Sequence, residues 1–169
     1  PSTPKHIILY QMFGWEVPRF AHLSLLVNEQ KQKLSKRHGD VSVEDFKAKG
    51  YLPEALVNFV AFLGWNPGDE REFFTLKELE QEFSLEKVAK TSAVFNRTKL
   101  DWYNKQYLMK LDLNEVTRRA IPFFRNAGVL DNKEINEPEE FEFLKKVVAL
   151  ERSRALTLVE LVESVEQSF

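Results

Sequence analysis

The sequence contains no cysteine among its 169 residues. Neither a disulfide bond nor a cysteine-ligated zinc site can therefore form. It also lacks an uninterrupted apolar run long enough to cross a bilayer, and it shows no signal peptide. These absences argue against a disulfide-stabilised secreted domain and against a membrane protein, so we expect a soluble, cytoplasmic protein with no membrane partner.

Neither sign of charge dominates. The 24 lysine and arginine residues against 26 aspartate and glutamate residues leave a net charge of -2, which predicts no general attraction to nucleic acid, so any RNA contact must come from local patches. The hydrophobic fraction of 43% is typical of a globular protein. A chain of this length forms one to two compact units.

Histidine is also scarce, and its three positions do not suggest a catalytic or metal-binding set. We expect His6 on a helix surface, His38 in a solvated loop, and His22 in an apolar strand as a hydrogen-bonded core residue. No Ser/His/Asp arrangement is recognisable, and we predict no metal site in this chain.

Capping patterns predict a mainly α fold. Residues Phe20 to Val27 form a run rich in apolar residues that favours a short strand, and the polar residues 28–40 favour a loop. Cap and proline signals predict helices that begin near Pro4, Ser42, Pro53, Thr75, Asn96, Asp112, Pro138 and Thr157. Pro122 falls inside one of these helices, where we expect a kink or a break.

A basic cluster stands out in the polar segment: Lys33-Leu34-Ser35-Lys36-Arg37. Ammonium groups and a guanidinium fork pair with phosphate oxygens, and a serine hydroxyl adds a neutral hydrogen bond, so the cluster suits a triphosphate. A short basic run is more often a solvated loop or a nucleic-acid patch. The surrounding sequence has to decide between these readings.

The cluster resembles the KMSKS signature of class I aminoacyl-tRNA synthetases, in the KLSKR form of the glutamyl-tRNA synthetases. Flanking segments occur in the order and at about the spacing of the bacterial-type glutamyl family. They are Thr3-Pro4-Lys5-His6, Phe20-Ala21-His22-Leu23, Val41-Ser42-Val43, Gly50-Tyr51-Leu52-Pro53-Glu54-Ala55-Leu56, Leu63-Gly64-Trp65 and Phe95-Asn96-Arg97-Thr98-Lys99-Leu100-Asp101-Trp102. The resemblance covers essentially the whole chain and is sharpest from Pro1 to Tyr107.

The resemblance implies a role for each residue of the cluster. Lys36 matches the lysine that contacts ATP, where a preorganised ammonium stabilises charge as pyrophosphate leaves, and Lys33 would assist it. Ser35 would bond a phosphate or fix the loop, Arg37 would serve either ligand, and Leu34 would anchor the loop on its apolar side. ATP is then a substrate, and Mg²⁺ is expected with it in the complete enzyme.

The resemblance also implies an architecture. Residues 1–40 correspond to the end of a Rossmann-type catalytic domain, residues 41–111 to a helical stem-contact domain, and residues 112–169 to the first part of a helical anticodon-binding region. No counterpart of the half that carries the HIGH motif is present, so the chain resembles an internal or C-terminal piece, which we expect to be inactive alone and monomeric.

The implied activity is ATP-dependent attachment of glutamate to tRNA(Glu) through a glutamyl-adenylate. Arg118 and Arg119 precede Pro122 on a helix with few acidic neighbours, so they are candidates for contact with the tRNA backbone, although solvated helix faces are the default. Two alternatives remain open: a non-catalytic helical RNA-binding module, and a glutaminyl-tRNA synthetase. The helical pattern after Lys110 favours the glutamyl enzyme over the glutaminyl one, whose anticodon region is built of β-barrels.

Overall fold

The computed structural model describes residues 2–34, 42–130 and 138–168. Its elements in chain order are α1 (Thr3–Met12), β1 (Leu26–Val27), α2 (Val43–Ala48), α3 (Pro53–Ala61), α4 (Leu76–Glu82), the 3-10 helix η2 (Leu85–Lys87), β2 (Ala93–Val94), α5 (Arg97–Lys110), α6 (Leu113–Asn126), α7 (Pro138–Glu151) and α8 (Leu158–Ser168). The predicted mainly α class is therefore confirmed. None of the helices within these ranges is long and apolar enough to cross a membrane.

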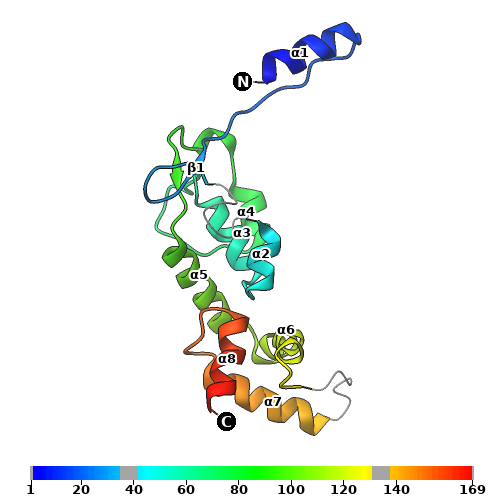
Figure 1. The fold of residues 1–169 in the computed structure, drawn as a ribbon. Helices are drawn as coiled ribbons and strands as arrows, with labels where there is room; N and C mark the ends of the chain where they lie inside the picture. The colour runs from blue at the N-terminus through cyan, green and yellow to red at the C-terminus, as the bar shows by residue number, and fades with distance from the viewer. Residues whose placement is uncertain (1, 35–41, 131–137, 169) are drawn as a thin grey trace.

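The molecule is elongated, and its elements fall into three parts along its length (Figure 1). Helix α1 stands at one end, joined to the rest by the extended residues 13–25. The middle part holds α2 to α5 with the two strands, and α6 to α8 form the far end. Trp15 is 62% exposed and stacks on Phe13, so the N-terminal part buries little apolar surface of its own.

The strand predicted for Phe20 to Val27 is wrong over most of its length. Only Leu26 and Val27 pair, in parallel with β2, in the register Leu26 to Ala93 and Val27 to Val94. A strand needs a partner edge, and β2 is only two residues long, so residues 20–25 have no ladder to join. His22 consequently lies exposed, with Nε2 3.4 Å from the hydroxyl oxygen of Thr3, and its predicted place in the core is also wrong.

Local capping explains where the helices begin. Ser42 with Asp45, and Thr75 with Glu78, form reciprocal capping boxes at the starts of α2 and α4. Asn96 caps α5 by accepting a hydrogen bond from the Lys99 amide. These predicted helix starts are confirmed.

Of the kink or break expected at Pro122, the break does not occur. Helix α6 runs without interruption from Leu113 to Asn126. Proline removes a single backbone hydrogen bond within the helix, and Pro122 lies on the exposed side while Val116, Ala120 and Phe124 are fully buried on the other. Burial of that face holds the helix together through the missing bond.

Within the described residues three hydrophobic cores lie in the middle and far parts, and the smallest, formed by Trp65, Phe74 and Leu79, belongs to the middle part. Another joins Phe46, Phe59, Leu100 and Tyr103 from α2, α3 and α5. The largest core is centred on α6, α7 and α8, but it also takes in Leu52, Ala55 and Leu108 from the middle part: its buried members are Leu52, Ala55, Leu108, Val116, Ala120, Phe124, Leu144, Val147, Val148, Ala155, Leu158, Leu161, Val162 and Val165. The two helix groups therefore share one core where they meet.

Candidate functional site

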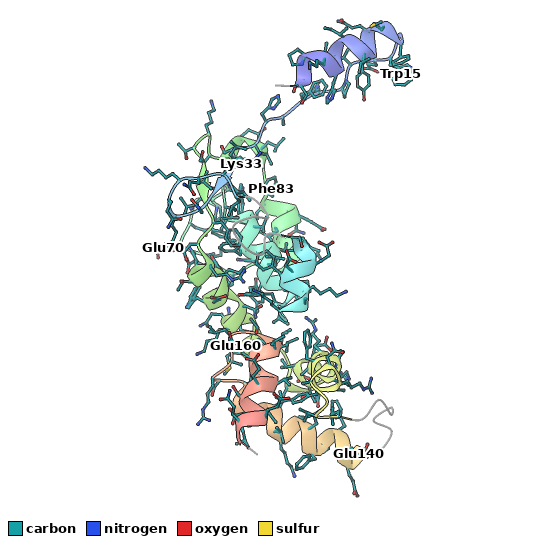
Figure 2. All side chains as sticks on the ribbon, viewed as in Figure 1. Trp15, Lys33, Glu70, Phe83, Glu140 and Glu160 are labelled. Atoms are coloured by element: carbon teal, nitrogen blue, oxygen red, sulfur yellow. The ribbon has the colours of Figure 1, made fainter. Side chains whose placement is uncertain are left out.

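Lys33 and Leu34 stand at the end of a tight turn that folds back on β1. The Gln32 amide donates to the side-chain oxygen of Asn28 over 2.8 Å, and the Asn28 amide donates to the Gln32 carbonyl over 2.8 Å. The Leu34 amide then donates to the Leu26 carbonyl over 3.1 Å. These bonds hold Lys33 beside β1, where Figure 2 shows it at the surface.

The turn is anchored to the middle part of the molecule. The pairing of β1 with β2 supplies one anchor. The side-chain amide of Asn96 supplies another by donating to the carboxylate of Glu29 over 3.1 Å, while its side-chain oxygen caps α5. The start of α5 and the lysine-bearing turn are thereby fixed to each other.

The chain is fixed again at the far side of the basic cluster. The Asp45 amide donates to the Ser42 hydroxyl oxygen over 3.2 Å, and the Ser42 amide donates to the Asp45 carboxylate over 3.1 Å. Residues 35–41 thus connect two anchored points. Ser35, Lys36 and Arg37 fall outside the described residues, so of the predicted cluster the structure places only Lys33, which is exposed, and Leu34, which is half-buried.

The two arginines predicted to contact RNA differ in their surroundings. Arg119 donates from both terminal nitrogens to the Glu54 carboxylate, over 2.9 and 2.8 Å, and from Nε to Glu115 over 2.7 Å. The Arg118 side chain is 65% exposed, and its Nη1 lies 3.8 Å from the Glu115 carboxylate. Both arginines therefore have acidic neighbours, contrary to the expectation from sequence.

The pairing between Arg119 and Glu54 joins α6 to α3. Partial burial raises the pKa of the Glu54 carboxyl, but the hydrogen bonds from Arg119, a backbone hydrogen bond at Glu54 and the positive charge of Arg119 together hold that pKa below its ordinary value. The guanidinium of Arg119 is hydrogen-bonded to Glu54 and Glu115, whereas that of Arg118 faces solvent and is accessible to a ligand. Sequence spacing reveals the Glu115 partner, four residues before Arg119. Glu54 is too distant in sequence to be found in that way.

No group of three histidine or acidic side chains able to hold a metal ion occurs within residues 2–34, 42–130 and 138–168. Mg²⁺ usually binds through substrate phosphates with one or two carboxylates and several waters.

A profile of the family described as tRNA synthetases class I (E and Q), catalytic domain, matches residues 1–102, from α1 into α5. This is more than half of the chain. The chain therefore belongs to the class I tRNA synthetases of the E and Q type.

Several proteins similar to this chain are glutamate–tRNA ligases. The chain is 47% identical over 162 residues to the glutamate–tRNA ligase of Clostridioides difficile, and 49% identical over 164 residues to that of Fusobacterium nucleatum. These alignments cover 96% and 97% of the chain but 32% of each relative. The chain thus spans about a third of the length of these ligases.

A solved structure of a glutamate tRNA ligase resembles the fold of this chain. The glutamate tRNA ligase from Elizabethkingia meningosepticum, crystallised in complex with its amino acid, superposes with a TM-score of 0.74 at 32% identity, over 98% of this chain and 35% of that one. The resemblance to bacterial-type glutamyl-tRNA synthetases inferred from the sequence is confirmed.

Proposed function

We propose that this chain is part of a glutamate–tRNA ligase, and that it supplies the ATP-contacting lysine loop together with helices that bind tRNA. The observation that carries the proposal is the match to glutamate–tRNA ligases over nearly the whole chain. The complete enzyme joins glutamate to tRNA(Glu) through a glutamyl-adenylate, with ATP and Mg²⁺, in the cytoplasm.

In this proposal residues 33–37 act on the triphosphate. Lys36 stabilises the charge that develops as pyrophosphate departs, and Lys33 adds a second ammonium group from the anchored turn. Such contacts raise the rate more than the affinity when they are strongest in the transition state. The anchoring at Leu34 and at Ser42 supports this role, because it fixes the two described points of the chain that flank the cluster.

The three segments of the chain have separate proposed roles, and two of them contact the tRNA. Residues 1–40 end the catalytic domain, residues 41–111 contact the inner side of the L-shaped tRNA, and residues 112–169 begin the anticodon-binding region. Arg118 is the better of the two candidate phosphate contacts because its side chain faces solvent, whereas Arg119 is paired with Glu54 and Glu115.

The test is ATP–pyrophosphate exchange by the complete ligase with glutamate and tRNA. Lys36→Ala should lower the exchange rate about 100-fold or more, equivalent to about 3 kcal/mol of lost electrostatic stabilisation, while tRNA affinity stays within about twofold of wild type. The 169-residue chain alone should show no exchange.

Lys31→Ala is the matched control. Lys31 is an exposed lysine two residues before the cluster, and its replacement should leave exchange unchanged. An undiminished rate in Lys36→Ala, or equal losses in the two variants, would remove the assigned role of Lys36. Exchange that depends on glutamine rather than glutamate would show that the complete enzyme is a glutaminyl-tRNA synthetase.

A further inference from the structure

Gly50 makes an unusually close contact between the two helix groups. It follows α2 with a φ of +76° and is buried, and its carbonyl accepts a hydrogen bond from the Leu158 amide over 3.0 Å. A Cβ at this position would lie 2.8 Å from the amide nitrogens of both Leu158 and Val159. Only glycine lets the end of α2 approach the start of α8 so closely.

Asn104 reinforces the same contact from α5. Its side chain is fully buried, and its oxygen accepts a hydrogen bond from the Leu52 amide over 2.8 Å. Its amide nitrogen donates to the Leu156 carbonyl over 2.5 Å. One side chain thus ties the segment between α2 and α3 to the segment that leads into α8.

Hydrogen bonds also fix the conformation of the segment that leads into α8. The Leu156 amide donates to the Glu160 carboxylate over 2.8 Å, and the Glu160 amide donates to the Thr157 hydroxyl over 3.2 Å. Figure 2 shows Glu160 where α8 approaches the middle part of the molecule. We call Gly50, Leu52, Asn104, Leu156 and Leu158 the junction clamp.

The clamp matters because the most extensive helix packing lies within each group rather than between them. Helix α3 packs chiefly on α5 and α4, and α6 packs on α8 and α7. The relative position of the two groups therefore depends on the clamp, on the shared core and on the Glu54–Arg119 pair.

We infer that the junction clamp is a positioning element for RNA binding: it holds the two helix groups at the spacing at which one folded tRNA contacts both at once. The inference rests on the proposed function. When two contact surfaces are rigidly joined, the second contact forms within a complex that already exists, and overall affinity can exceed that of either surface by orders of magnitude. A loosened clamp lowers the overall affinity for tRNA without altering either contact surface.

The test compares two RNAs on the 169-residue chain: a full tRNA(Glu) transcript and a hairpin that contains only its acceptor stem. Gly50→Ala should weaken binding of the full tRNA roughly tenfold or more, because the second contact loses its fixed geometry. Binding of the hairpin, which reaches only one helix group, should change less than about twofold if that group is intact.

Gly128→Ala is the control. Gly128 has a φ of +77°, nearly that of Gly50, but nothing lies within 4 Å of its would-be Cβ. The substitution imposes the same backbone strain without pushing the groups apart, and it should leave both RNA affinities near wild type. Circular dichroism at the binding temperature shows whether each variant is folded.

Asn104→Ser provides a second route should Gly50→Ala fail to fold, because it removes the two hydrogen bonds made by the Asn104 side chain without adding bulk. It should reproduce the selective loss of full tRNA. Equal losses for tRNA and hairpin, or no loss in either clamp variant, would overturn the inference. If the wild-type chain bound neither RNA, the proposed function itself would fall instead.

Discussion

Tyr103 and Tyr107 lie one turn apart on α5, but their hydroxyl groups meet different surroundings. The Tyr103 hydroxyl is buried and has no hydrogen-bond partner within the described parts of the chain, and burial raises its pKa to about 12. The Tyr107 hydroxyl oxygen lies 2.8 Å from the Phe74 carbonyl oxygen and 3.0 Å from the side-chain oxygen of Asn58. The first tyrosine contributes packing alone, whereas the second also links α5 to the segment before α4.

This difference predicts that a tyrosine-to-phenylalanine substitution changes the free energy of unfolding differently at the two positions. Tyr107→Phe should lower the free energy of unfolding by about 1 kcal/mol or more, because it leaves the Phe74 carbonyl without its donor. Tyr103→Phe should leave it unchanged or raise it slightly, because the deleted hydroxyl makes no bond and is costly to bury. Urea unfolding of the two variants measures both effects, and a larger loss for Tyr103→Phe would refute the comparison.

At the scale of elements, the Glu54–Arg119 pair fastens α6 to α3. Removal of either partner would leave the other charge partly buried without this ion pair, and reversal of one charge would place two like charges side by side. The pair is also pH-dependent: because the folded-state pKa of Glu54 is lowered, its contribution is fully present above the pKa of the unfolded chain. The contribution is lost as pH falls through the folded-state value.

A charge swap tests whether this link is structural. Glu54→Arg and Arg119→Glu should each lower the free energy of unfolding, by about 1 kcal/mol given that the side chains are 38% and 29% exposed. The double variant should recover much of the loss, because it restores opposite charges in reversed positions. Thermal unfolding in low salt is the measurement, and additive losses in the double variant would contradict a direct pair.

Sequence reasoning succeeded where the determinants are local. The capping boxes at Ser42 and Thr75 involve residues three apart, so their pattern is complete within a few positions. It failed for Phe20 to Val27, because an apolar run becomes a strand only if a partner edge runs beside it, and β2 is too short. The expectation that Arg119 has few acidic neighbours failed partly for the same reason, because Glu54 lies on another helix, although Glu115 lies only four residues before it.

The basic cluster is a different case. Its assignment to ATP came from family resemblance rather than from periodicity or spacing, and Ser35, Lys36 and Arg37 lie outside the described residues. Their roles remain predictions. What the structure adds is the anchoring on either side of the cluster, at Leu34 and Ser42, which no sequence pattern would have shown for Leu34.

At the scale of the whole molecule, a net charge of -2 means that the proposed tRNA binding must depend on particular cations. Arg118→Gln should weaken tRNA binding by the 169-residue chain and reduce the slope of log affinity against log salt by roughly 0.9, the change for one lost phosphate contact. Retention of tRNA across a salt series gives both values.

Arg19→Gln supplies the comparison, since Arg19 is exposed on the extended segment far from α6. It removes the same charge elsewhere and should leave the slope unchanged. An unaltered slope in Arg118→Gln would reduce Arg118 to a solvated residue on a helix face.

The pairing of β1 with β2 has a consequence for the order of folding. Helices α6, α7 and α8 follow one another in sequence and pack together, so they can assemble through short loop closures. The register of Leu26 with Ala93 joins segments separated by α2, α3, α4 and η2, and long loops close at a higher entropic cost and more slowly. When the complete unfolded chain refolds, the turn that bears Lys33 is therefore expected to be among the last features to form, after the neighbouring helices have packed.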